Sequence, residues 1–212
     1  MMLQFFSVDT IAFTIFNYPM SYIELLGTVF NLWSVWLIAK KKMLTWPTGI
    51  IGVILFMILF YQIQLYSDAL EQIYYLGVSI YGWYAWSKVK KDNNISVKFS
   101  HPRVIILFII GTLILSGAIG LFMSHIHIYW PKLFPEPASF PYWDALTTMM
   151  SFTAMWLMTL RRKESWIYWI IVDIIAVILY SVKDIKLVAI LYFIFLCLAS
   201  NGFRLWLKEK DA

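Results

Sequence analysis

Cysteine, charged residues and interior prolines are scarce in this chain, and each shortage excludes a class of protein. The 212 residues include one cysteine, Cys197, inside an apolar run. A disulfide framework and a cysteine metal site are therefore excluded. Only 14% of the residues are charged, whereas soluble domains carry about 25%. No proline lies in the interior of a long apolar run, so each run can form an unbroken helix.

Sequence signatures of enzymes are also missing. The chain has no G-x-x-x-x-G-K-[ST] phosphate loop, no H-E-x-x-H zinc motif and no G-x-S-x-G nucleophile motif. His125 and His127 have no third metal ligand close to them in the sequence. We therefore predict that the protein is not an enzyme and has no cofactor and no metal site.

Apolar and aromatic residues dominate what is present. Hydrophobic residues make up 61% of the chain, aromatic residues 19%, and the mean hydropathy is +0.73. These values indicate an integral membrane protein whose main partner is the lipid bilayer. A bilayer core of about 30 Å needs about 20 apolar helical residues to cross it. The runs that meet this length are 20–39, 46–66, 68–87, 104–124, 141–160, 166–182 and 186–207.

Most basic residues fall on one side of a seven-span arrangement. Of the 17 lysines and arginines, 14 lie near the C-terminal ends of the first, third, fifth and seventh spans or in the segments that follow them, and all these segments fall on the same side. Cytoplasmic loops carry such an excess, so we expect the N-terminus outside and the C-terminus in the cytoplasm. The net charge of +5 then reflects topology, and no nucleic-acid partner is expected. Residues 1–19 are expected to form an interfacial segment, not a cleaved signal peptide.

The sequence repeats itself at a shift of 120 residues. Identical residues that meet at this shift include Trp36/Trp156, Trp46/Trp166, Trp86/Trp206 and Gly82/Gly202. The first three spans and the last three are therefore predicted to be two copies of one unit. The fourth span makes the copies parallel, as in transporters that bind substrate near the midplane between two repeats.

The predicted fold is an all-α membrane protein with seven transmembrane helices in a 3+1+3 order. Its expected parts are an N-terminal segment 1–19, a first bundle 20–87, a linker 88–139 with the helix 104–124, a second bundle 140–207 and a cytoplasmic tail 208–212.

Short motifs along nearly the whole chain resemble the PnuC family of vitamin transporters. These motifs are FFSV at 5–8, WPTGIIG at 46–52, YQIQLYSD at 61–68, SIYGWYAW at 79–86, FPYWD at 140–144, ESWIYWIIVD at 164–173 and SNGFRLW at 200–206. The family is best known for nicotinamide riboside, and its fold is similar to that of the SWEET sugar transporters.

The resemblance to this family implies a specific function, which composition and spacing do not indicate by themselves. It implies facilitated uptake of nicotinamide riboside across a bacterial inner membrane without ATP hydrolysis, with flux maintained by a cytoplasmic kinase that phosphorylates the substrate. Riboside-type members often carry an amide where this chain has Asp173, so thiamine is the alternative substrate. A non-transporting receptor or membrane enzyme is a second alternative. The sequence is also compatible with a homo-oligomer.

Asp173 is the residue that points most directly to a site. A carboxylate in the middle of a membrane span costs roughly 2.5 to 3.5 kcal/mol, so it persists only where something compensates for it. Trp166, Trp169 and Tyr180 share its helical face. Aromatic rings beside a carboxylate suit a flat organic cation such as a pyridinium. Trp166 also fits an interface anchor, and Asp173 a bridge to a neighbouring helix.

Other polar residues inside the spans are candidates for binding a carboxamide and ribose hydroxyls, because a dry site must replace each lost water bond. Small polar residues also stabilise contacts between membrane helices, so packing is the alternative role for each. The candidates are Asn31, Gln72, Ser79, Tyr192 and Asn201.

Overall fold

The computed structural model describes residues 6–15, 17–89, 95–132, 134, 136–138, 140–182 and 185–209. Within these ranges the elements are β1 (Ile11–Ile15), β2 (Tyr18–Ser21), α2 (Tyr22–Ala39), α3 (Thr45–Gln62), α4 (Tyr66–Ser87), α5 (Pro102–Tyr129), α6 (Pro141–Thr159), α7 (Ser165–Val182) and α8 (Lys186–Leu207). Residues 1–5 of the predicted N-terminal segment and 210–212 of the predicted tail lie outside the described residues.

Each of the seven predicted spans overlaps one of these helices. The bounds agree within a few residues, except that α5 continues to Tyr129. Five helices, α2, α3, α5, α7 and α8, are long and apolar enough to cross a membrane. The two others, α4 and α6, are more polar and begin with acidic residues in the first turn. The chain is therefore a multi-pass membrane protein, and its two more polar helices pack against each other.

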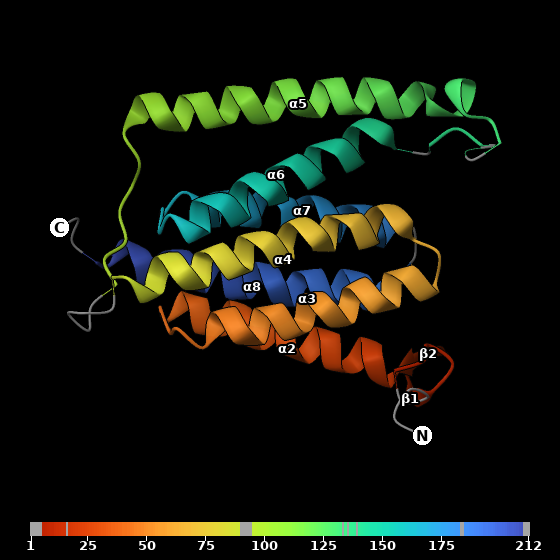
Figure 1. The fold of residues 1–212 in the computed structure, drawn as a ribbon, viewed down its shortest axis with the longest axis horizontal. Helices are drawn as coiled ribbons and strands as arrows, with labels where there is room; N and C mark the ends of the chain where they lie inside the picture. Colours follow the sequence, from red (N-terminus) through yellow and green to blue (C-terminus); the bar gives the residue numbers. More distant parts are fainter. Residues whose placement is uncertain are drawn as a thin grey trace.

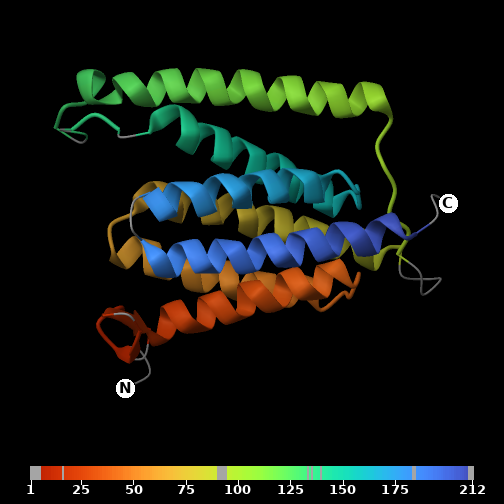
Figure 2. The ribbon, with the colours of Figure 1, turned by 180° about the vertical axis from the view of Figure 1, so that it is seen from behind.

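Six helices run side by side, and α5 lies along one flank of the group next to α6 (Figures 1 and 2). The first three helices contact one another in order, as do α6, α7 and α8. Between these two groups the main contacts are α2 with α8 and α4 with α6. We call the end with the α2–α3 and α6–α7 turns and the end of α8 the basic end, and the opposite end the hairpin end.

A small β-hairpin precedes the first helix and was not predicted from the sequence. Strands β1 and β2 pair antiparallel, with Ile15 opposite Tyr18. Asn17 lies in the turn with a φ of 64°, a conformation that asparagine adopts more readily than most residues. The all-α expectation therefore fails for this segment, because the alternation of Ile11, Phe13 and Ile15 fits a strand as well as an interfacial segment.

The two helical turns at the basic end have the same backbone geometry. Lys41 and Arg161, which are 120 residues apart, have φ values of 54° and 59°. The N–H of the residue after each of them donates to a carbonyl of the preceding helix at 3.0 Å, from Lys42 to Leu37 and from Arg162 to Leu157. Such left-handed residues end helices and reverse the chain.

Four tryptophans fill the core at the basic end. Trp46, Trp86, Trp166 and Trp206 are each 1% exposed or less. Edge-to-face contacts join Trp46 to Trp86 at 5.3 Å and Trp166 to Trp206 at 5.5 Å between ring centroids. Trp86 and Trp206 then meet each other at 6.5 Å, so the rings of both helix groups form one continuous cluster.

Glycines make room for two of these rings. A Cβ atom on Gly82 would lie 2.2 Å from the ring of Trp46, and one on Gly202 would lie 2.6 Å from the ring of Trp166. Both distances are far below van der Waals contact. Neither ring can move away freely, because both are buried among the other tryptophans.

We predict that Gly82→Ala and Gly202→Ala each destabilise the protein by about 1 to 3 kcal/mol, the usual cost of overpacking. Gly77→Ala in the same helix as Gly82 is the matched control, because its Cβ would meet nothing within 4 Å. Thermal unfolding in detergent measures the difference. Equal melting temperatures for Gly82→Ala and Gly77→Ala would contradict the packing described here.

Candidate substrate site

Asp173 lies midway along α7 with its side chain enclosed by protein. The residue is only 4% exposed, and Val172 and Ala176 beside it are also buried. Within the described ranges, Asp173 takes part in no hydrogen bond and no ion pair. A charge at this depth persists only if something compensates for it. The described protein supplies no such group, which leaves a ligand as the candidate.

Two tyrosines lie between Asp173 and the hairpin end. Tyr180 on α7 and Tyr192 on α8 stack with their planes 10° apart and their centroids 5.5 Å apart. Tyr192 also interacts electrostatically with Asp173. Trp169 lies one turn before Asp173 on α7, is half-buried and packs against the core. The structure thus brings Trp169, Asp173, Tyr180 and Tyr192 into one neighbourhood.

Three other predicted site residues are engaged in packing. Trp166 and Ser79 are each 1% exposed, Trp166 within the tryptophan cluster at the basic end. The Asn31 side-chain nitrogen donates to the Gly27 carbonyl at 3.0 Å, and its amide lies against Gly52 of α3. For Ser79 and Asn31 these contacts fit the alternative role in helix packing, whereas Trp166, for which the alternative was an interface anchor, lies in the buried cluster at the basic end.

Gln72 and Asn201 have no polar partner among the residues that the structure describes. Gln72 is half-buried on α4, and Asn201 is exposed on α8. Their amides therefore keep free donors and acceptors. Both remain predictions as substrate contacts.

Glu71 is an acidic residue near this neighbourhood that was not singled out from the sequence. It is half-buried on α4, and the Thr148 hydroxyl on α6 donates to its carboxylate at 2.9 Å. Tyr192 interacts electrostatically with Glu71 as well as with Asp173. The signal was available, because Glu71 lies inside the predicted span 68–87 and a carboxylate there raises the same question as Asp173.

The basic end is closed by contacts between the two helix groups. The Trp86 indole N–H donates to the Thr159 carbonyl at 3.0 Å, and the Trp206 indole N–H donates to the Ala39 carbonyl at 3.2 Å. Each donor and each acceptor is 120 residues from its counterpart, so the two bonds are reciprocal. Each tryptophan therefore fastens the end of a helix in the other group.

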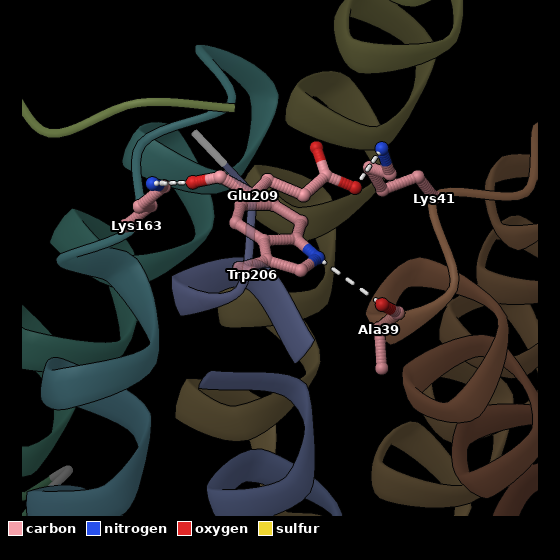
Figure 3. A network of polar contacts seen from close by, with 5 residues as sticks. All are labelled: Ala39, Lys41, Lys163, Trp206 and Glu209. Atoms are coloured by element: carbon pink, nitrogen blue, oxygen red, sulfur yellow. Dashed lines mark hydrogen bonds and ion pairs between the residues drawn. The ribbon is translucent and has the colours of Figure 1, made fainter. Parts of the chain in front are cut away.

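Glu209 adds a polar bridge outside these indole bonds (Figure 3). Its carboxylate forms an ion pair with Lys41, which follows α2. Its backbone carbonyl accepts a hydrogen bond at 2.8 Å from the ammonium of Lys163, which lies just before α7. Glu209, a single residue that follows α8, thus connects the turns of both helix groups.

The described part of the linker between α4 and α5 is hydrogen-bonded to the second group, while its Ile95 and Val97 pack in the core cluster that both groups share. The Lys98 N–H donates to the Arg161 carbonyl at 3.2 Å, and the Lys163 N–H donates to the Lys98 carbonyl at 3.1 Å. The buried carboxylate of Glu164 accepts the Ser100 N–H at 3.2 Å. Together with the contact of α5 on α6, these bonds attach α5 to the second group.

Two hollows on the surface lie away from Asp173. One of 220 Å³ lies between α4, α5 and α6, with Tyr74, Phe108 and Trp156 in its wall. Another of 400 Å³ lies along α5 near His125 and Tyr129. Both are open and carry no acidic residue in their walls, so neither matches the chemistry expected for a cation.

Comparison with known proteins shows the family. Residues 21–208 match the family described as nicotinamide mononucleotide transporter. The chain belongs to this family. It is 31% identical to the nicotinamide riboside transporter PnuC of Escherichia coli, over 98% of this chain and 95% of that protein. As a member of the PnuC transporter family, it is not an enzyme, and the enzyme alternative is excluded.

More distant members of the family are similar along most of their length. The PnuC of Neisseria mucosa is 24% identical, over 98% of this chain and 79% of that protein. The riboflavin/roseoflavin transporter RibM of Streptomyces davaonensis is 24% identical, over 92% of this chain and 89% of that protein. A crystal structure of the vitamin B3 transporter PnuC has the same fold, with a TM-score of 0.65 and 23% identity. The match covers 88% of this chain and 81% of that one.

The absence of a described partner for Asp173 leads to a prediction about stability. Asp173→Asn removes a buried charge without changing the shape of the residue, so the ligand-free protein should melt a few degrees higher. Thermal unfolding in detergent without substrate measures this. A lower melting temperature would contradict the account, because it would mean that Asp173 stabilises the fold through a bond of its own.

Proposed function

We propose that this chain carries nicotinamide riboside across a bacterial inner membrane by facilitated diffusion. The relative that is 31% identical along nearly its whole length is a transporter for this compound. The observation in this chain that carries the proposal is the carboxylate of Asp173, 4% exposed and without a described partner. The pyridinium of nicotinamide riboside is a permanent cation of the kind that such a group would accept.

The substrate ring lies between aromatic side chains in this proposal. Trp169, Tyr180 and Tyr192 provide ring faces, which attract a desolvated cation by about 0.5 to 2 kcal/mol each. Asp173 provides the charge partner. Gln72 and Asn201 have free amides for the carboxamide and ribose, while Trp166, Ser79 and Asn31 contribute to helix packing. Thiamine, also an aromatic cation, is the alternative substrate, and the RibM relative supports variation of the vitamin within the family.

In the proposed mechanism, two helix bundles move against each other to transport the substrate. The first is the three-helix bundle α2 to α4, and the second is α6 to α8 with α5 attached, the two bundles being parallel repeats. Rocking of one against the other opens the site alternately to each side, without ATP. The matching turns, tryptophans and indole bonds 120 residues apart support the repeat. Net uptake then depends on phosphorylation of the substrate by a cytoplasmic kinase.

Orientation in the membrane follows from charge. The described basic residues gather mainly at the basic end, in the turns after α2 and α6, around the α4–α5 linker and after α8. Positive residues favour the cytoplasmic side, so we place the basic end and the C-terminus there, and the hairpin end outside. The closure at the basic end is then the cytoplasmic gate.

Uptake into liposomes tests the proposed substrate. Purified protein without ATP should take up labelled nicotinamide riboside saturably, and Asp173→Asn should reduce uptake of this cation by about tenfold or more while affecting its neutral, reduced form less. Glu136→Gln, which removes an exposed loop charge, is the control and should behave like the wild type. Equal losses for both compounds would remove charge pairing from the mechanism.

The gate can be tested by chemical labelling. Trp86→Phe with Trp206→Phe removes both indole bonds but keeps aromatic rings. In a Cys197→Ala background, Ser165→Cys places a thiol at a position that is 0% exposed at the basic end. Loss of two hydrogen bonds of about 1 kcal/mol each should raise the labelling rate by a membrane-impermeant thiol reagent roughly 5- to 30-fold.

Trp143→Phe is the matched control for this labelling experiment. Trp143 is exposed at the other end of α6, and its substitution should leave the rate unchanged. An unchanged rate in the double variant would show that the indole bonds do not hold this end closed.

A further inference from the structure

A second carboxylate reaches the neighbourhood of Asp173 from the other helix group. Asp173 lies on α7, whereas Glu71 lies on α4. Tyr192 interacts electrostatically with both of them. Tyr75, one turn after Glu71 on α4, interacts with Glu71 and with Tyr192. Glu71, Asp173, Tyr75 and Tyr192 are thus close to one another between the helix groups, and Asp68 of α4 also interacts with Tyr192 and Glu71.

The Glu71 carboxylate is oriented by one hydrogen bond and keeps free acceptor capacity. The Thr148 hydroxyl on α6 donates to Oε1 of Glu71 at 2.9 Å. In the described part of the chain, Glu71 has no other hydrogen bond and no ion pair. A carboxylate can accept about four hydrogen bonds, so Oε2 and the second lone pair of Oε1 are available to a donor.

Neither acidic residue is required by the repeated scaffold. At a shift of 120 residues, the position of Glu71 is occupied by Leu191 and that of Asp173 by Val53. The donor Thr148 matches Thr28, which has no acidic partner at the corresponding place. Both helix groups therefore supply carboxylates at positions where the other group has an apolar residue, and Asp68, which matches Val188, follows the same rule. This placement is typical of a site, because packing alone would favour the apolar residue in both.

Asp173 gives independent support for a ligand between the two groups, because it is buried and has no partner in the described ranges. A permanent organic cation balances one of the two negative charges. The second carboxylate is compensated best by N–H or O–H donors on the same ligand, since hydrogen bonds to a charged acceptor are stronger than neutral ones.

We propose that Glu71 is a second specificity-determining residue, which accepts a hydrogen bond from a donor group of the substrate while Asp173 faces its cationic ring. This inference rests on the transporter function proposed above. The substrate class is an aromatic cation with a carboxamide or amine group. The carboxamide of nicotinamide riboside and the amine of thiamine share this chemistry. Compounds in which a carboxylate replaces the carboxamide are rejected by charge repulsion.

Binding calorimetry on the purified full chain tests this selectivity. The first pair of probes is nicotinamide riboside and nicotinic acid riboside, which differ in carboxamide against carboxylate. The second pair is thiamine and oxythiamine, which differ in the ring amine. The wild type should bind the amide or amine member of at least one pair more tightly. The pair with the higher affinity identifies the substrate.

Glu71→Gln should reduce that preference by about tenfold or more. In the first pair the reason is twofold, because glutamine is a weaker acceptor for the carboxamide and can donate to the carboxylate. Asp173→Asn should weaken both members of a pair equally, since both keep the cationic ring. Glu136→Gln is the matched control for loss of a carboxylate elsewhere and should change neither affinity nor preference.

A second variant keeps the test decisive if Glu71→Gln does not fold. Thr148→Val removes the hydroxyl that orients Glu71 and should also reduce the preference, whereas Thr28→Val at the matching position should not. An unchanged preference in a folded variant at Glu71 or Thr148 would overturn the role of Glu71 while leaving the transporter function intact. Failure of the wild type to bind any of the four compounds would overturn both.

Discussion

The function of this protein is constrained most by the buried carboxylate of Asp173, which has no partner among the described residues. Inside a bilayer, water cannot compensate for a carboxylate, and the described protein offers Asp173 neither a cation nor a hydrogen-bond donor. Stability alone would select an apolar residue, as at Val53 in the matching position. The retention of a carboxylate therefore indicates a role that appears when a cation is bound, and the stacked tyrosines nearby suit such a ligand.

Features that recur in both helix groups and features present in only one of them have different roles. The tryptophans, the left-handed turn residues and the indole bonds recur at a shift of 120 residues and close the basic end. Asp173, Glu71, the bond from Thr148 to Glu71 and the hydrogen bonds of the linker do not recur. We infer that the recurring features hold the bundles together and that the non-recurring features determine what is bound.

Much of the fold followed from the sequence, because membrane helices need long apolar runs and the chain has few interruptions. All seven helices of the described chain were placed within a few residues over most of their length. The β-hairpin was missed, since a short alternating segment is ambiguous next to a membrane. For the site, Asp173 and its aromatic neighbours share a helical face that periodicity reveals, and Tyr192 was expected as a polar residue at depth.

The remaining features depend on contacts between distant segments. Trp206 and Ala39 are joined across almost the whole chain, and Glu209 joins two turns, which no local pattern encodes. Glu71 was overlooked although the rule applied to Asp173 covers it equally. Its partner Thr148 is visible only once α4 and α6 are packed together.

A structure of the protein with nicotinamide riboside bound would show whether Asp173 binds the cation. We expect the pyridinium ring within about 6 Å of an aromatic face and beside the Asp173 carboxylate. A ligand bound elsewhere, with Asp173 still unpartnered or bonded to another side chain, would contradict it.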